Sequence, residues 1–267
     1  MAQPVAPPVD YADYRMNRLR EVAGRFEIRP DYCVKLRQLE GYEIVLLCDD
    51  SGSMGALIDQ NINTSDPFRR NMTRWDELRN YVTIVTDVAA TLDANGLDIY
   101  FLNRPPIGGV SSAQQIQGAF QYPPQGYTPL NRVFNQIMNE KAAVIREKKM
   151  LLIIATDGQP TDDNGNSRIE QFLSTLKNRP KNVYVSILAC TDDAASVSYL
   201  NKIDRMVPGI DVCDDYRSEH KEVLKAQGSN YKFSFGDYVV KTLLGPIDPM
   251  FDNLDERKIQ SGCCTIC

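Results

Sequence analysis

The feature that most constrains the fold is a short apolar run that ends in an acidic, hydroxyl-rich segment. Residues 43–48 (EIVLLC) are mostly apolar and β-favouring, and they lead directly into residues 49–53 (DDSGS). A continuous apolar run of this length is typical of a strand buried on both faces, as in a parallel sheet. Ligand sites in open parallel sheets lie beyond the carboxyl ends of the strands. We therefore expect the oxygen-bearing side chains of this segment to lie at such an edge.

The rest of the chain alternates strand-like and helix-like patterns. Further strands are predicted at 97–102, 150–155, 183–189 and 210–213, and helices at 75–92, 112–120, 129–138, 168–176, 194–206 and 236–244. Thr73 is the expected cap of the first of these helices, and Thr128 the expected cap of the third. This alternation indicates an α/β fold with a doubly wound, mostly parallel central sheet flanked by helices on both faces, which is a Rossmann-like arrangement.

We expect one domain with an extension at each end. With 267 residues and 43% hydrophobic content, the chain can fill one large core. Residues 1–40 combine a Pro-rich start with helical patterns and are predicted to form an extension packed on the domain. The domain itself is predicted to span 41–247, and residues 248–267 to form a tail that ends in a cysteine cluster.

Three segments that lie far apart in the sequence are predicted to converge on one edge of the sheet. They are residues 49–53, Thr128 at a predicted helix start, and Asp157 at the end of another buried strand. Asp50 should point away from its neighbour, so the set offers two carboxylates and three hydroxyls. Oxygen-only ligands suit a hard divalent ion, and Mg²⁺ fits best because it needs few carboxylates. Mn²⁺ is a credible substitute, whereas Ca²⁺ usually takes more ligands.

These segments, Asp-x-Ser-x-Ser, Gly-x-Thr-Pro-Leu and Thr-Asp-Gly-x-Pro-Thr-Asp, resemble those of a von Willebrand factor type A (vWA) domain. In that family they form the metal-ion-dependent adhesion site (MIDAS). The resemblance implies a vWA-like fold across the predicted domain. It also implies that Ser51, Ser53 and Thr128 ligate the ion, and that Asp49 and Asp157 ligate it directly or through water.

Two departures from the family pattern bear on which partner fits. Tyr127 stands where family members often have Gly, which would put a ring beside the metal opening. Residues 54–73 are longer than the usual run into the first helix, and they are either a binding loop or lid, or an inert surface insertion.

The ligand set favours binding over catalysis. Two carboxylates about neutralise a divalent ion, which then remains able to take a carboxylate oxygen from a protein partner. A hydrolase needs further groups, such as a nucleophile with a base, and the one histidine, His220, is expected to be a solvated surface residue. We therefore expect a non-enzymatic protein interaction module. The alternatives are a Mg²⁺-dependent phosphohydrolase and a lipid-anchored scaffold whose metal site is incidental.

Charge and cysteine content bear on partners and location. The formal charge of -5 without any Lys/Arg block argues against nucleic acid. No apolar run is long enough to span a bilayer, the start does not resemble a secretory signal, and the odd set of seven cysteines fits a reducing cytoplasm. Cys48 and Cys190 are expected to be buried thiols. The end of the chain has the outline of a prenylation box at Cys264, beside Cys263 and before Cys267, which would add membrane association through lipid.

Overall fold

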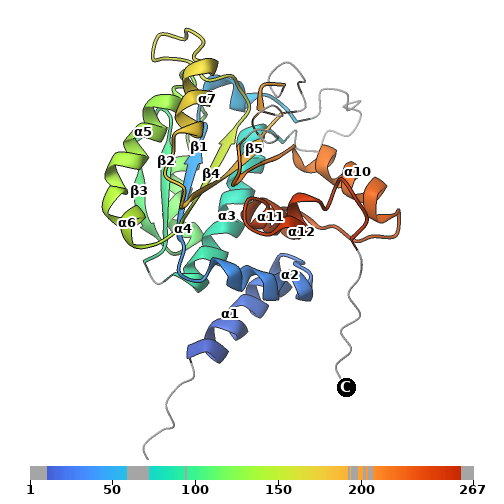
Figure 1. Ribbon diagram of the computed structural model, residues 1–267. Helices are drawn as coiled ribbons and strands as arrows, with labels where there is room; N and C mark the ends of the chain where they lie inside the picture. The colour runs from blue at the N-terminus through green and yellow to red at the C-terminus, as the bar shows by residue number, and fades with distance from the viewer. Residues whose placement is uncertain are drawn as a thin grey trace, which may run out of the picture.

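The computed structural model describes residues 11–58, 72–93, 95–191, 193, 198–200, 203 and 207–259. It confirms an α/β fold on a mostly parallel sheet (Figure 1). The strand order is β3-β2-β1-β4-β5-β6. The strands are β1 Glu43–Cys48, β2 Leu97–Phe101, β3 Ile107–Val110, β4 Met150–Thr156, β5 Val183–Ala189 and β6 Ile210–Cys213. Only β3 of these strands runs antiparallel to its neighbour, β2.

Ten α-helices fall within the described residues. They are α1 Tyr11–Arg25, α2 Pro30–Lys35, α3 Arg74–Leu92, α4 Ala113–Phe120, α5 Leu130–Glu140, α6 Ala142–Glu147, α7 Ile169–Lys177, α10 Tyr216–Gln227, α11 Phe235–Leu244 and α12 Pro249–Asp252. Short 3₁₀ turns occupy Leu36–Leu39 (η1) and Gly52–Gly55 (η2). None of the described helices is both long enough and apolar enough to cross a bilayer.

The centre of the sheet is the place where the strand order reverses. β1 and β4 are neighbours in register, and the chain proceeds from β1 to β2 on one side and from β4 to β5 on the other. The backbone N–H of Asp49 extends this pairing by donating to the carbonyl oxygen of Ala155 at 2.8 Å. In open sheets such a reversal creates a crevice beyond the carboxyl ends of the two strands. The ends of β1 and β4 therefore meet where a ligand site is expected.

The side chains of β1 divide between two hydrophobic clusters. Ile44, Leu46 and Cys48 belong to a cluster that includes residues of α1, α3, α4 and α11. Val45 and Leu47 belong to a second cluster that includes residues of α5, α6 and α7. Both sets of alternate side chains are buried to within a few per cent of full burial. This two-sided burial explains why residues 43–48 form a continuous apolar run.

The N-terminal helices pack against the C-terminal part of the described chain. The hydroxyls of Tyr32 and Tyr231 lie 2.6 Å apart, and the backbone N–H of Arg29 donates to a carboxylate oxygen of Asp237 at 2.8 Å. Phe251 of α12 is fully buried against the ring of Tyr32, with 4.8 Å between ring centroids. The beginning of the predicted tail is therefore packed, whereas residues 1–10 and 260–267 lie outside the described residues.

Local helix signals were predicted well, and an edge strand was missed. Thr73 caps α3 in a capping box with Asp76, as predicted, and Ser112 forms a second capping box at α4. Residues 107–110, which are rich in glycine, were not among the predicted strands. They form β3 at the edge of the sheet, where the Asp98 carboxylate accepts a hydrogen bond from the N–H of Gly109. The helices α6, α10 and α12 were not among the predicted helices, and most of the helix predicted at 194–206 lies outside the described residues.

Candidate functional site

The structure brings together side chains from the ends of β1 and β4. The Oγ atoms of Ser51 and Ser53 lie 3.1 Å apart, and Ser53 Oγ donates to Asp157 Oδ1 at 2.8 Å. The hydroxyl of Thr128 lies beside the same strand end, since a Cβ built on Gly158 would be 3.6 Å from Thr128 Oγ1. Ser53 is exposed and the other predicted ligands are buried. The predicted oxygen-bearing groups therefore gather at the switch point of the sheet.

Asp49 is held from two sides and is fully buried. Its Oδ1 accepts from the backbone N–H of Ser51 at 2.9 Å, and its Oδ2 accepts from the hydroxyl of Thr156 at 2.6 Å. Burial, followed by repulsion from the Asp157 carboxylate, raises the pKa of Asp49 to about 7. The folded protein therefore places this carboxylate where a nearby positive charge would stabilise its ionised form.

Thr128 is held by a loop contact and does not cap a helix, so the predicted cap is wrong. Its N–H donates to Thr161 Oγ1 at 3.0 Å, and its carbonyl accepts from the N–H of Thr161 at 2.9 Å. Helix α5 begins at Leu130, and the residue before it, Pro129, makes no side-chain cap. The pairing with Thr161, which follows β4, keeps Thr128 out of the helix and directs its segment toward the end of β4.

Asp50 points away from the other groups, as predicted. Its Oδ1 accepts from the backbone and side-chain nitrogens of Asn103 at 2.8 and 3.1 Å, and Arg104 forms an ion pair with its Oδ2 at 3.1 Å. These partners follow β2. Asp50 thus joins the carboxyl ends of β1 and β2 and contributes no free carboxylate to the site.

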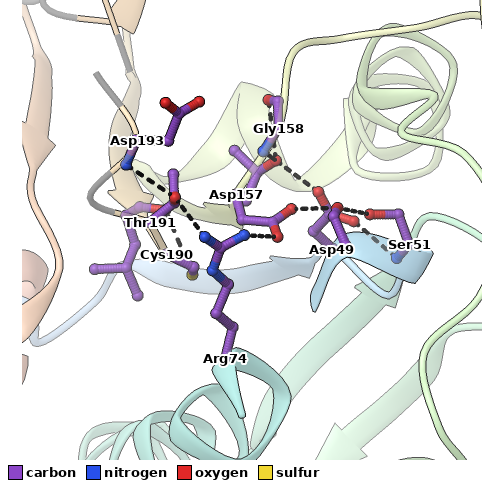
Figure 2. Close-up of polar contacts among 11 residues, drawn as sticks. Asp49, Ser51, Arg74, Asp157, Gly158, Cys190, Thr191 and Asp193 are labelled. Atoms are coloured by element: carbon purple, nitrogen blue, oxygen red, sulfur yellow. Dashed lines mark hydrogen bonds and ion pairs between the residues drawn. The ribbon is translucent and has the colours of Figure 1, made fainter. Parts of the chain in front are cut away.

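Arg74 was missed by sequence reasoning. Figure 2 shows its side chain rising from the start of α3 to Asp157 and Thr191, with donor distances of 2.8 Å to Asp157 Oδ2 and 2.8 Å to Thr191 Oγ1. Asp157 therefore uses one oxygen for Ser53 and the other for this guanidinium. The only sequence signal was the position of Arg74 directly after the cap residue Thr73, which indicates a helix start and says nothing about a contact with β4.

The donor set fits a small hard cation. Ligands on adjacent corners of a Mg²⁺ octahedron lie about 3.0 Å apart, because Mg–O distances are about 2.1 Å. The hydroxyl pair of Ser51 and Ser53 and the pair of Ser53 with Asp157 Oδ1 have this spacing, at 3.1 and 2.8 Å. No group of three or more His, Cys, Asp or Glu side chains suited to a metal ion occurs among the described residues. An ion here would therefore depend on the hydroxyls as well as on Asp49 and Asp157.

A cavity of about 680 Å³ adjoins this site on the side of Arg74. Arg74 and Thr191 line one part of it, and Glu77, Asp215 and Tyr238 line others. Burial, followed by repulsion from Asp215, raises the pKa of Glu77 to about 7. The cavity offers room for chemical groups that flank a ligand bound near Asp157.

The structure describes Tyr127 and the ends of the long loop, the two places where the sequence departs from the family pattern. The ring of Tyr127 lies against the turn at 162–166, since a Cβ on Gly165 would be 2.7 Å from Tyr127 Cε1, and its side chain is 55% exposed. The ends of the long loop are joined by an isolated bridge between Leu57 and Thr73. Residues 59–71, which hold the rest of that loop, lie outside the described residues.

The histidine prediction and the thiol prediction each held in part. His220 lies on α10 and is half-buried against Tyr216 and Phe233, with ring centroids 5.6 and 6.2 Å away. Tyr216, four residues earlier on the same helix, and Phe233, which follows the end of α10, account for this partial burial. Cys48 is buried and Cys190 is half-buried, and the described cysteines are all free thiols: Cys33, Cys48, Cys190 and Cys213.

Neither a protein-family model nor a curated protein matches the sequence. Among solved structures, the pilus adhesin SpaC from Lactobacillus rhamnosus GG is similar in part, at 15% sequence identity and a TM-score of 0.47. The similarity covers 76% of this chain and 31% of the adhesin chain, so this chain spans less than a third of that protein's length. A similarity of this size carries no argument about family or function.

Proposed function

We propose that this protein binds Mg²⁺ between Asp49, Ser51, Ser53, Thr128 and Asp157, and binds a carboxylate of a protein partner through that ion. The observation that carries this proposal is the hydrogen bond from the Ser53 hydroxyl to Asp157, 104 positions further along the chain, while the same hydroxyl also contacts that of Ser51. The proposal includes a doubly wound, vWA-like fold. The strand order and the two hydrophobic clusters support it.

Four of the five proposed ligands have parts that their contacts define. Ser51, Ser53 and Asp157 Oδ1 would hold the ion directly, because their oxygens already have the spacing of adjacent ligands. Asp49 would supply the second negative charge, with its orientation fixed by the Ser51 N–H and the Thr156 hydroxyl. Bound Mg²⁺ would supply a Lewis-acidic position for an outside carboxylate oxygen. Mn²⁺ would substitute for it, as hydroxyl and carboxylate oxygens suit both ions.

Calorimetric titration of Mg²⁺ into chelator-treated protein tests the ion site. We expect binding to one site, weakened in Asp49→Ala and in Thr128→Ala, while circular dichroism stays that of the folded protein. Asp163→Ala is the matched control, because Asp163 lies in the same region but is 66% exposed and paired with Arg132. Equal affinity in all four proteins, or no binding to the wild type, would remove the proposed site.

Affinity capture with and without chelator tests the partner. A protein retained in Mg²⁺ and released by chelator should also be lost when Asp49 is replaced by Ala, and when the acidic residue of that protein is replaced by its amide. Capture that is unchanged by both the chelator and the substitution would contradict the ion-mediated contact. Reproducible turnover of an aryl phosphate that disappears in Asp49→Asn would instead favour a phosphohydrolase.

A cytoplasmic location is also part of the proposal. The odd set of seven cysteines in the sequence supports a reducing compartment. Cys263, Cys264 and Cys267 lie outside the described residues, so lipid attachment there stays a prediction. The mass of the C-terminal peptide from native cells tests it, since an unmodified peptide would exclude the anchor.

A further inference from the structure

Arg74 places a fixed positive charge beside the candidate ion site. Its guanidinium contacts Asp157 Oδ2 and Thr191 Oγ1, each at 2.8 Å. The side chain of Asp157 is fully buried and that of Arg74 is 15% exposed. Water and salt therefore screen this pair less than they screen a surface ion pair. Asp157 Oδ1 still faces Ser53, so the guanidinium leaves the proposed ligand oxygen in place.

The charge balance differs with and without an ion. When both carboxylates are ionised, Asp49 and Asp157 carry two negative charges in a buried setting, and Arg74 offsets one of them. With a divalent ion bound, these three side chains and the ion together would carry a net positive charge. A carboxylate ligand would then restore neutrality.

We infer that Arg74 is a built-in counter-cation of this site. It stabilises the ion-free protein, lowers the affinity for Mg²⁺, and makes firm ion binding depend on a carboxylate ligand. This inference rests on the proposed function and specifies its regulation. By linkage, a carboxylate that tightens Mg²⁺ binding is itself bound more tightly when Mg²⁺ is present.

The effect of Arg74 on Mg²⁺ affinity can be estimated because the guanidinium and the ion would share the carboxylate of Asp157. With an ion about 2 Å from Asp157 Oδ1 and the guanidinium on Oδ2, the two cations lie about 5 Å apart. Even with the dielectric constant of water, Coulomb's law makes their repulsion worth about tenfold in affinity. A less polar setting would make it larger.

Mg²⁺ titrations and thermal melts of three variants test this inference. Arg74→Gln removes the charge, Arg74→Lys keeps the charge but not the two-pronged contact, and Arg79→Gln removes a charge from the exposed surface of the same helix, where Arg79 is 50% exposed. We expect Arg74→Gln to bind Mg²⁺ about tenfold more tightly. Arg74→Lys and Arg79→Gln should stay close to the wild type. Added acetate, as a carboxylate probe, should tighten Mg²⁺ binding in the wild type more than in Arg74→Gln.

The melts provide a second readout. Without an ion, Arg74→Gln should melt at a lower temperature than Arg79→Gln, and Mg²⁺ should raise its melting temperature more than that of the wild type. Unchanged or weaker Mg²⁺ binding in a folded Arg74→Gln would overturn the inference while leaving the proposed site intact. A variant that folds in neither condition would also overturn it, because the ion should replace the lost charge. A wild type that binds no Mg²⁺ would end the proposed function and this inference together.

Discussion

The stability of the ion-free protein should fall as Asp49 loses its proton. Asp49 is fully buried, and its burial, with repulsion from Asp157, raises its pKa from 3.8 to about 7. In the unfolded chain this carboxyl ionises near its ordinary value. Because the folded state holds the proton more tightly, the contribution to stability is fully present below the unfolded pKa. It is lost as the pH rises through about 7.

The magnitude follows from the size of the shift. One pKa unit corresponds to about 1.4 kcal/mol, so the rise from 3.8 to about 7 is worth about 4 kcal/mol. Most of it, about 3 kcal/mol, falls between about pH 5 and about pH 8. Burial also raises the pKa of Glu77 and of Glu219 to about 7, so both titrate in the same range. The informative quantity is therefore the difference between the wild type and Asp49→Asn, which lacks the titrating proton.

Urea unfolding in the presence of chelator, at about pH 5 and about pH 8, measures this difference. We expect the stability of Asp49→Asn relative to the wild type to improve by about 3 kcal/mol from the lower to the higher pH. Thr156→Val, made in the protein that keeps Asp49, should enlarge the loss of stability between the lower and the higher pH. The reason is that the Thr156 hydroxyl donates to Asp49 and favours its ionised form. Saturating Mg²⁺ should reduce the loss. The same difference between wild type and Asp49→Asn at both pH values would refute the reasoning.

Three further substitutions separate the roles of individual residues. Ser53→Ala should weaken Mg²⁺ binding by about 10–100-fold in calorimetry while costing only about 1 kcal/mol of stability, because this exposed hydroxyl has few other contacts. Glu219→Gln should destabilise the protein by about 3 kcal/mol in urea unfolding, because it breaks the buried ion pair with Lys241 at 3.0 Å. Replacing both residues of that pair by apolar ones should recover most of the loss. Gly126→Ala should cost about 1–3 kcal/mol and weaken Mg²⁺ binding, since Gly126 has a φ of 104° and a Cβ there would lie 2.5 Å from Asn103 Oδ1.

Features that depend on neighbouring residues could be predicted from the sequence. The capping box of Thr73 and Asp76 spans three residues, so both partners are visible in one short segment. The burial of β1 and β4 is visible as continuous apolar runs. Together with the alternation of strands and helices, these signals were enough to place Asp49 and Asp157 at one edge of a parallel sheet.

Features that depend on distant contacts could not be predicted. Arg74 and Asp157 are 83 residues apart, and the local sequence around either residue gives no indication that the two are in contact. Thr128 looked like a helix cap because it precedes Pro129, but its pairing with Thr161, 33 residues away, decides its position. The strand β3 was missed for the same reason, since its glycine-rich sequence becomes a strand only through pairing with β2.

Backbone contacts and side-chain contacts control different properties of the site. The loops that carry the hydroxyls are joined by backbone hydrogen bonds, from Gly52 N–H to the Gly126 oxygen at 3.2 Å and from Gln125 N–H to the Asp50 oxygen at 2.7 Å. Backbone bonds of this kind hold the loops in place whether or not an ion is bound. The charge of the site depends instead on side chains, above all on the pair of Arg74 with Asp157. We therefore expect an ion to change the charge presented to a partner far more than it changes the shape of the site.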